Sequence, residues 1–316
     1  MRHFAAAEVD AALDFPSLID ALAEAFRGGF HAPERHSHTI ERPGEATATA
    51  LLMPAWTTFG SGEDFLGAKI VNVFPGNGAR GLPAVQGVYV LQSGVTGAPI
   101  AVLDGARLTL WRTAAASALA ARHLARADAK RLLIVGAGQL APYLARAHAS
   151  VRPIEAIAVW NRRPEGAHRL AAALGGEGFN AHVVRRLEDA VRDADIVSCA
   201  TLSEAPLIAG AWLEPGQHLD LVGAFSMSMR EVDDGALKRA RIFVDTQAAT
   251  SEGGDVALGL KSGAITPADV AGDLATLVRG ALGRGGEREI TLFKSVGASI
   301  EDLAAAMLVW KRAGGR

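Results

Sequence analysis

The sequence around Lys69 indicates a buried lysine with a chemical role and not a solvent-exposed charge. It lies inside the apolar run 65–74, whose β-branched and aromatic residues are typical of a strand. Alternate residues of a strand face opposite sides, and a buried ammonium is costly unless it is paired or functional. The run therefore predicts a functional lysine, and the alternative is a charge that protects the edge of a sheet.

Arg112 is a second candidate. It precedes the small residues 113–117, which would let a ligand or another backbone approach the helix closely. The planar guanidinium group of arginine can bind both oxygens of a carboxylate. We therefore expect Arg112 to hold a carboxylate ligand, and the alternative is a structural salt bridge.

A glycine-rich turn over 136–141 has the pattern G-x-G-x-x-A. Gly136 allows a tight turn out of the strand, Gly138 lets the backbone approach a pyrophosphate, and the small Ala141 lets the following helix pack closely. The N-terminus of that helix offers free N–H groups to phosphates. The motif alone is weak, but it follows an apolar strand and opens a helix, so it predicts a dinucleotide site.

The next strand ends in Asn161, Arg162 and Arg163. A site for NAD usually has a carboxylate here that accepts a hydrogen bond from the ribose 2′-hydroxyl. Arginines instead pair with a 2′-phosphate through charge-assisted hydrogen bonds. These residues predict a preference for NADPH, with NADH possible, and the alternative is that both arginines are solvated surface charges.

The helices and strands that position these residues follow different patterns in the early and later parts of the chain. The early part has a helix ending at Gly28-Gly29 and short strands joined by a hairpin loop over 93–97. From residue 131 onward, apolar strands alternate with helices, which is typical of a parallel doubly wound sheet. We expect strands over 47–53, 65–74, 84–91, 99–103, 131–135, 154–159, 181–184, 196–200, 218–222, 242–245 and 289–294, and helices over 15–26, 106–125, 140–149, 187–192, 231–239 and 299–312.

The predicted fold class is α/β, with two domains. Residues 114–295 are expected to form a Rossmann-type dinucleotide-binding domain. Residues 1–113 with 296–316 are expected to form an α+β domain built from both termini, because the last strand and helix return to the first domain.

Composition excludes several classes of protein. The 316 residues carry a formal net charge of -2 without dense Lys/Arg runs, so no nucleic-acid partner is expected. No apolar stretch approaches ~18 residues, and residues 1–10 lack a signal-peptide core, so we expect neither a membrane span nor secretion. The single cysteine, Cys199, fits a reducing cytoplasm and is expected to be a buried small apolar residue. His36 and His38 alternate without a third ligand, so no metal site is expected.

The chain resembles the ornithine cyclodeaminase/mu-crystallin family in motifs spread over residues 50–305. The most specific are Arg-Thr-Ala-Ala-Ala-Ser-Ala at 112–118 and Phe-Lys-Ser-Val-Gly at 293–297, and further matches are Leu-Leu-Met-Pro-Ala at 51–55, Gly-Ala-Lys-Ile-Val at 67–71, Gly-Leu-Pro at 81–83, Gly-Ala-Gly at 136–138, Val-Trp-Asn-Arg at 159–162, Val-Gly-Ala at 222–224 and Arg-Glu at 230–231. The resemblance implies a homodimer joined through the domain that does not bind dinucleotide, and a substrate site between domains.

The resemblance also implies roles for single residues. Lys69 matches the family's substrate-site lysine, and Arg112 matches its carboxylate-binding arginine. Arg35 matches a second carboxylate-binding arginine, although the pattern around it is loose. The positions where the family contacts the dinucleotide correspond here to Thr113, Gln139, Leu140, Asn161, Thr201, Val222 and Ser295.

One departure from the family pattern narrows the activity. Ornithine cyclodeaminases carry an aspartate where this chain has Phe225, and phenylalanine cannot accept a proton or bind an ammonium through a carboxylate. The segment 222–234 is more similar to the Δ1-pyrroline-2-carboxylate reductase branch. The resemblance therefore implies NAD(P)H-dependent reduction of a cyclic α-imino acid with a five- or six-membered ring. Lys69 is our candidate for orienting or protonating the ring nitrogen, and the alternative is that its ammonium only binds the carboxylate. The alternatives are an amino-acid dehydrogenase of the alanine dehydrogenase type, an ornithine cyclodeaminase, and a crystallin-like protein that binds NADPH and a ligand without catalysis.

Overall fold

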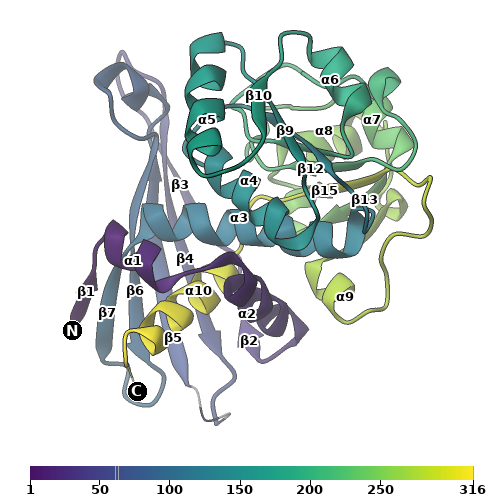
Figure 1. The fold of residues 1–316 in the computed structure, drawn as a ribbon. Coiled ribbons are helices and arrows are strands. Elements are labelled where there is room, and N and C mark those ends of the chain that lie inside the picture. The colour runs from purple at the N-terminus through teal and green to yellow at the C-terminus, as the bar shows by residue number, and fades with distance from the viewer. Residues whose placement is uncertain (61, 63, 316) are drawn as a thin grey trace. The chain divides into compact units, whose positions relative to one another are not determined.

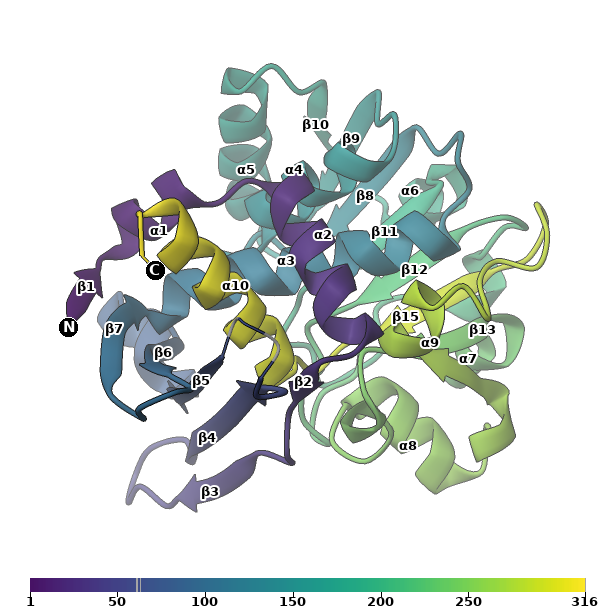
Figure 2. The same ribbon diagram turned by 90° about the horizontal axis from the view of Figure 1, so that it is seen from below.

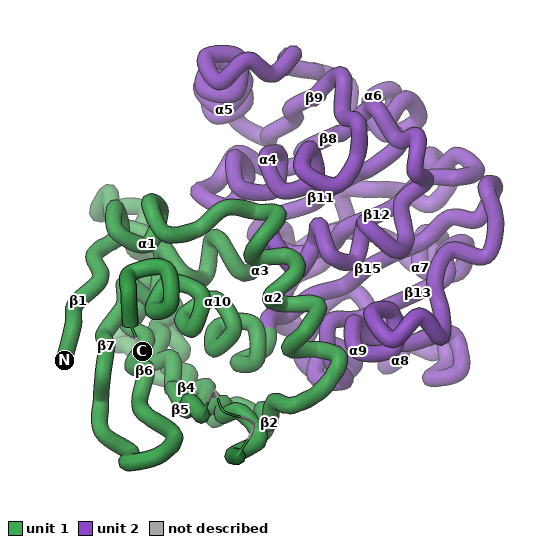
Figure 3. The backbone as a smooth tube through the Cα atoms, turned by 60° about the horizontal axis from the view of Figure 1, so that its bottom comes forward, with its two compact units in different colours: residues 1–113, 298–316 green, residues 114–297 purple. Residues whose placement is uncertain are grey.

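The structure is a computed structural model that describes residues 1–60, 62 and 64–315. The chain forms two compact units, unit 1 of Met1–Thr113 with Ala298–Arg316 and unit 2 of Ala114–Gly297 (Figure 3). The first boundary, after Thr113, falls inside the long helix α3 (Gly105–Leu124), and the second falls after Gly297.

Unit 1 is built on a mixed sheet, called sheet A. Its strand order is β1-β7-β6-β5-β4-β2, with β3 also paired to β4. The β1–β7 pair is parallel and the other pairs are antiparallel. The elements of unit 1 beside α3 are β1 (Arg2–Phe4), α1 (Ala6–Ala12), α2 (Phe15–Arg27), β2 (Phe30–His31), β3 (His36–Ile40), β4 (Ala48–Thr57), β5 (Phe65–Val73), the 3₁₀ turn η1 (Pro75–Arg80), β6 (Val85–Ser93), β7 (Pro99–Asp104) and α10 (Ser299–Arg312).

Helices cover one face of sheet A. Helix α10 contacts β4, β5 and β6 and packs against α2, so the C-terminal helix lies beside the second helix of the chain (Figure 2). Helix α2 begins where the Asp14 side chain accepts a hydrogen bond from the Ser17 N–H at 2.9 Å. It ends at Gly28, whose φ of 149° a residue with a side chain rarely adopts. The predicted helices over 15–26 and 299–312 are thereby confirmed.

The other face of sheet A exposes a row of apolar side chains. Leu52, Ile70 and Val88 are paired in register across β4, β5 and β6. Their exposed fractions are 39%, 43% and 42%. Because alternate residues face opposite sides, this row lies on the face away from the buried Lys69.

Unit 2 is built on a fully parallel sheet, called sheet B, with strand order β10-β9-β8-β11-β12-β15-β13-β14 (Figure 1). The first five strands have the order 3-2-1-4-5 of a Rossmann sheet. The elements are β8 (Arg131–Val135), α4 (Ala141–Val151), β9 (Ala156–Trp160), α5 (Pro164–Gly176), β10 (Ala181–Val183), α6 (Leu187–Asp193), β11 (Ile196–Cys199), η2 (Gly210–Trp212), β12 (His218–Leu221), α7 (Asp234–Arg239), β13 (Arg241–Val244), η3 (Gln247–Thr250), α8 (Gly254–Ser262), η4 (Pro267–Asp269), β14 (Val270–Asp273), α9 (Leu274–Val278) and β15 (Thr291–Lys294). The predicted doubly wound sheet is confirmed.

Sheet B is buried on both faces, as a parallel sheet requires. Leu133, Val197 and Leu219 face a core shared with α6, α7 and α8. On the opposite face, His148 of α4 lies within hydrogen-bonding distance of Asp220 of β12, Nε2 to Oδ2 at 3.1 Å. Because both faces of the sheet are buried, β8 and β11 consist of nearly continuous apolar residues. This pattern makes both strands predictable from the sequence.

The structure differs from the predicted elements in several places. Helix α7 begins at Asp234 and not at residue 231, because the Asp233 side chain caps it by accepting from the Ala236 N–H. Helix α5 opens at Pro164, a residue suited to a first helical turn. The elements β1, α1, β2, β3, α5, α8, β14 and α9 are not among the predicted ones.

Candidate active site and dinucleotide edge

Unit 1 places Lys69 on the face of sheet A that α10 covers. Its register neighbours are Met53 on β4 and Tyr89 on β6. The residue is 1% exposed, and its Nζ atom lies 2.8 Å from Asp302 Oδ2 and 2.9 Å from Oδ1. Lys69 is therefore a buried, paired ammonium and not an edge charge of the sheet.

Arg112 joins the same cluster from α3. Its Nε donates to Asp302 Oδ1 at 3.0 Å and its Nη1 donates to Glu301 Oε2 at 2.7 Å. Three ion pairs join the two cations, Lys69 and Arg112, to the two carboxylates, Glu301 and Asp302. The formal charges of these four residues cancel, and we call them the buried quartet. Arg112 therefore forms a structural salt bridge, which was the alternative interpretation of this residue from the sequence. The two carboxylates use two of its three guanidinium nitrogens, so a ligand carboxylate cannot bind all three.

The electrostatics of the buried quartet bring Lys69 toward neutral pH. Burial and the Arg112 charge lower the pKa of Lys69 to about 8, while Asp302 and Glu301 oppose that shift. The pKa of Arg112 is raised because Asp302 and Glu301 outweigh its burial. The Tyr89 hydroxyl is buried without a hydrogen-bond partner among the described residues, and burial raises the pKa of Tyr89. Lys69 is the group of this cluster that can exchange a proton near neutral pH.

The sequence analysis did not identify Glu301 and Asp302. Both lie in the first turn of α10, where acidic residues usually stabilise a helix N-terminus. A signal was available, because Asp302 recurs at helical spacing with the apolar Ala306 and Val309. All three side chains are buried, so the apolar face of α10 carries Asp302 into the sheet.

Two other predicted residues of unit 1 lie outside the buried quartet. Arg35 is half-buried in the connection between β2 and β3, one residue before β3 begins. Thr113 follows Arg112 on α3 and is 7% exposed. Their contacts with substrate and dinucleotide stay predictions.

In unit 2 the glycine-rich turn has the geometry that a pyrophosphate needs. Gly136 has a φ of 105°, and a Cβ there would lie 2.6 Å from the Ala200 carbonyl oxygen. A Cβ on Gly138 would meet no atom within 4 Å, so this backbone borders open space. Helix α4 follows at Ala141 and directs its N-terminal N–H groups to the same edge. The turn therefore fits a dinucleotide.

The end of β9 shows two different uses of its polar residues. Asn161 Oδ1 accepts from the Ala137 N–H at 3.3 Å and its Nδ2 donates to the Arg163 carbonyl at 2.8 Å, so this side chain joins the two loops. Arg162 and Arg163 are exposed, and neither side chain pairs with a carboxylate among the described residues. Both guanidinium groups are accessible to an anionic ligand.

The remaining predicted dinucleotide residues of unit 2 gather at one edge of sheet B. Thr201, Val222 and Ser295 follow the carboxyl ends of β11, β12 and β15, and those ends are paired in register. Gln139 is exposed and Leu140 half-buried in the turn after β8. The Ser295 hydroxyl is buried and has no partner in the described part of the chain. Ligands of open α/β sheets bind outside this edge.

A buried carboxylate lies beneath that edge. Glu231 accepts hydrogen bonds from the loops after β11 and β12, and its neighbour Asp255 pairs with Lys294 Nζ at 3.3 Å. Burial raises the pKa of Glu231 to about 7, although Lys294 opposes the shift. From the sequence, Glu231 is recognisable only as part of a family motif, because nothing in an isolated Arg-Glu pair indicates that the glutamate is buried.

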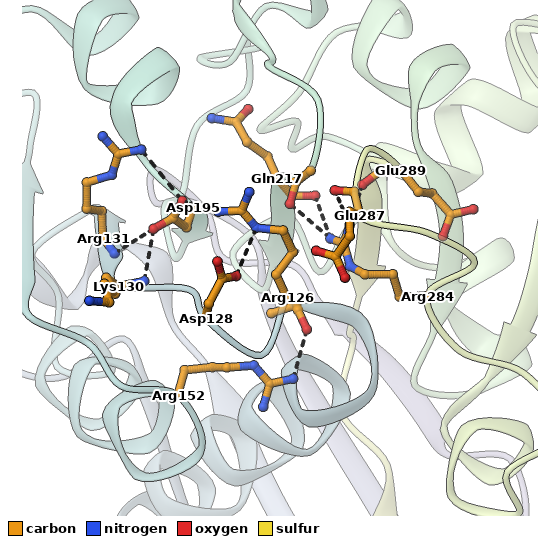
Figure 4. A network of polar contacts seen from close by, with 12 residues as sticks. Arg126, Asp128, Lys130, Arg131, Arg152, Asp195, Gln217, Arg284, Glu287 and Glu289 are labelled. Atoms are coloured by element: carbon orange, nitrogen blue, oxygen red, sulfur yellow. Dashed lines mark hydrogen bonds and ion pairs between the residues drawn. The ribbon is translucent and has the colours of Figure 1, made fainter.

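The amino ends of the strands of sheet B are held by a separate polar network (Figure 4). Asp195 accepts from the Lys130 and Arg131 N–H groups at 2.9 Å each and from Arg126 Nη2 at 2.7 Å. Arg152 Nη2 donates to three carbonyls at the C-terminal end of α3, those of Ala121, Arg122 and Ala125. This network fixes the edge opposite the dinucleotide edge.

Other residues singled out from the sequence have simpler surroundings. Cys199 is fully buried, as expected, and burial raises the pKa of its thiol. Phe225 is half-buried in the loop after β12. His36 and His38 are exposed on β3, and the described residues contain no cluster of His, Cys, Asp and Glu able to hold a metal. Within the described ranges, no helix is long and apolar enough to cross a membrane.

A Rossmann-type unit with an open glycine turn, together with a unit that carries a buried lysine–arginine–carboxylate cluster, defines a two-unit dinucleotide-binding protein. The chain belongs to the ornithine cyclodeaminase/mu-crystallin family, whose model matches residues 3–316. It is 44% identical to the Δ1-pyrroline-2-carboxylate reductase of Paracoccus denitrificans over 289 residues, which cover 90% of each chain.

Two solved structures share the fold over nearly the whole chain. Thermococcus litoralis Δ1-pyrroline-2-carboxylate reductase in complex with NADH and L-proline has a TM-score of 0.94 and 31% identity, covering 99% of this chain and 97% of that one. An archaeal alanine dehydrogenase dimer with bound NAD has a TM-score of 0.90 and 30% identity, covering 99% and 96%. The family identified from sequence motifs is confirmed.

Proposed function

We propose that this protein is an NAD(P)H-dependent reductase of a cyclic α-imino acid, converting Δ1-pyrroline-2-carboxylate to L-proline and accepting the six-membered homologue. The observation that carries the proposal is the buried quartet, in which Lys69 and Arg112 combine a group able to exchange a proton with a carboxylate-binding cation. The relatives named for this reaction support it.

In this proposal Lys69 supplies the proton that the imine needs. A protonated C=N bond is the better acceptor, and Lys69 donates to the ring nitrogen directly or through a water. The nicotinamide, when bound, supplies a hydride to the imine carbon. A second proton from solvent gives the ammonium form of the product, and Lys69 is then reprotonated.

Arg112 positions the substrate in this proposal. We assign the substrate carboxylate to its Nη2, for which the described residues show no hydrogen bond, and Arg35 is a second candidate for that carboxylate. Because the buried quartet is formally neutral, an incoming carboxylate adds one negative charge beside Lys69. That charge favours the protonated form of Lys69 at the time the proton is needed.

The proposed cofactor is NADPH, with NADH as the weaker ligand. Arg162 and Arg163 are exposed at the end of β9 and make no ion pair within the described residues, which suits a 2′-phosphate. The proposed dinucleotide contacts are those of Gly136, Gly138, Gln139, Leu140, Asn161, Arg162, Arg163, Thr201, Val222 and Ser295, with Thr113 from unit 1.

The proposed assembly is a homodimer formed through the outer face of sheet A. Leu52, Ile70 and Val88 form an apolar row there that a second copy of the same row would cover. The alanine dehydrogenase of similar fold is a dimer, which supports the proposal.

A second candidate is an amino-acid dehydrogenase, favoured by the 0.90 TM-score of the archaeal alanine dehydrogenase. A screen separates the two by measuring NADPH and NADH oxidation with the five- and six-membered imino acids and with pyruvate plus ammonia. The proposed function predicts turnover of the imino acids. Turnover of pyruvate plus ammonia alone would replace it by the dehydrogenase.

A further inference from the structure

Glu231 joins two loops at the carboxyl edge of sheet B. Its Oε1 accepts from the Thr201 N–H at 2.7 Å and from the Thr201 hydroxyl at 2.9 Å. Its Oε2 accepts from the Gly223 N–H at 2.9 Å and from the Ala224 N–H at 3.3 Å. The residue is fully buried, so one carboxylate with no access to water organises the loops after β11 and β12.

The fit of these loops around the carboxylate is close. A Cβ on Gly223 would lie 2.1 Å from the Thr201 carbonyl oxygen and 2.4 Å from Glu231 Oε1. Only glycine allows this approach, because both contacts are well inside the distance that a methyl group tolerates. The relative position of the two loops is therefore set by Glu231.

A second carboxylate extends the connection to a third strand. The N–H groups of Glu231 and Val232 donate to Asp255 Oδ1 at 2.7 and 3.0 Å. Asp255 pairs in turn with Lys294, the last residue of β15, which directly precedes Ser295. The ends of β11, β12 and β15 are thus linked through buried side chains.

The strand order indicates which part of a dinucleotide would contact the loops after β11 and β12. Strands β8, β9 and β10 form the first mononucleotide-binding half, with the glycine turn and Arg162. Strands β11 and β12 begin the second half, on the other side of the point where the strand order reverses. The adenine half of the dinucleotide lies against the first set and the nicotinamide half against the second.

We infer that Glu231 is a positioning residue that holds the loops after β11 and β12 in the conformation that receives the nicotinamide half of the cofactor. The inference rests on the dinucleotide binding in the proposed function but not on the imino-acid substrate. Glu231 acts through Thr201, Gly223 and Ala224, and binding of the adenine half does not depend on it.

The test compares Glu231→Gln with the parent protein. Glutamine offers one oxygen where the carboxylate offers two, so one loop loses its acceptor and meets an N–H₂ group instead. We expect the Kd for NADPH to rise about tenfold, the loss expected for a charge-assisted hydrogen bond. The affinity for 2′,5′-ADP, which carries the adenine, its ribose and the 2′-phosphate but not the nicotinamide-side ribose, is expected to stay the same.

Both affinities are measured by titration without imino acid, so an error in the proposed substrate does not affect the result. Glu204→Gln, an exposed change in the loop after β11, is the matched control and is expected to leave both affinities unchanged. Failure of the parent protein to bind NADPH would refute the proposed cofactor instead. Equal weakening of NADPH and 2′,5′-ADP, or no weakening of either, would overturn the inference.

A variant that keeps the charge covers the case in which Glu231→Gln does not fold. Glu231→Asp has a shorter side chain that reaches one loop only. We expect it to fold, to bind 2′,5′-ADP normally and to bind NADPH more weakly, with a raised KM for NADPH and a kcat near the parent value at saturating cofactor. Normal NADPH affinity in this variant would contradict the positioning role.

Discussion

Asp302 holds Lys69 through both of its carboxylate oxygens, at 2.8 and 2.9 Å from the ammonium nitrogen. The same carboxylate accepts from Arg112 at 3.0 Å, so one side chain of α10 orients both cations of the candidate site. Arg112, Glu301 and Tyr89 are the other ionisable groups that act on this pair from α3, α10 and β6. The C-terminal helix therefore raises the pKa of Lys69 against the opposing effects of burial and of Arg112.

Replacing Asp302 by asparagine is expected to move the pH dependence of turnover. Asp302 raises the pKa of Lys69 against the effect of burial, and the balance leaves it at about 8. Activity that requires the protonated lysine falls as the pH rises through that value, and without the carboxylate it falls at lower pH. The pH profile of kcat measures the shift. Glu301→Gln, which removes a charge that contacts Arg112, is expected to move the profile less.

An unchanged profile in Asp302→Asn would show that Lys69 is not the group whose titration limits turnover. Lys69→Ala provides a separate check, because turnover of the imino acid is expected to fall by about 10²-fold or more when a general acid is removed. Full activity of Lys69→Ala would rule out its role as proton donor.

The double change of Arg162 and Arg163 to alanine is expected to weaken NADPH binding by about tenfold or more while leaving NADH unaffected. The reason is that, in the proposed function, the two guanidinium groups contact only the 2′-phosphate. Dissociation constants for both cofactors measure the effect. Arg169→Ala, an exposed arginine on α5, serves as the control for a lost surface charge. A parent protein that prefers NADH would contradict the assigned preference.

Ile70→Lys is expected to convert the protein to a monomer. The change places a charge in the middle of the apolar row of Leu52, Ile70 and Val88, where a partner would have to desolvate it. Light scattering after size-exclusion chromatography measures the mass in solution. Val95→Lys introduces the same charge at a residue that is 81% exposed at the tip of a hairpin, and is expected to keep the parent mass. A parent protein that is monomeric would refute the proposed dimer.

The sequence predicted the strands of sheet B well because a parallel sheet buries both faces. The runs 131–135 and 196–200 are apolar for that reason, and β8 and β11 occupy them almost residue for residue. Lys69 was identifiable because a single charge interrupts an apolar strand. In each case, burial leaves a pattern in residues that are adjacent along the chain.

The carboxylates were not identified because their partners are distant in sequence. Asp302 lies 233 residues from Lys69, and Glu231 lies 30 residues from Thr201, so no local pattern connects them. An acidic residue in the first turn of a helix has an adequate local explanation, as for Asp302 in α10. Tertiary contacts alone show that these carboxylates face buried cations and backbone N–H groups.

Asp195→Asn is expected to destabilise unit 2 by about 2 kcal/mol, because it weakens the acceptor of two partly buried backbone hydrogen bonds and removes one carboxylate partner of Arg126. Chemical denaturation measures the free energy of unfolding. Asp193→Asn, at an exposed partner of Arg131, is the control and is expected to change that free energy by less than about 0.5 kcal/mol. Equal effects of the two substitutions would show that the network at the amino edge is not what stabilises the sheet.

The assay of NADPH oxidation with Δ1-pyrroline-2-carboxylate tests the central claim most directly. We predict L-proline formed in a one-to-one ratio with NADPH consumed, and loss of that turnover in Lys69→Ala. Ammonia released from ornithine without net consumption of cofactor would show a cyclodeaminase instead. Tight NADPH binding without turnover of any imino acid would contradict the account and leave a binding protein.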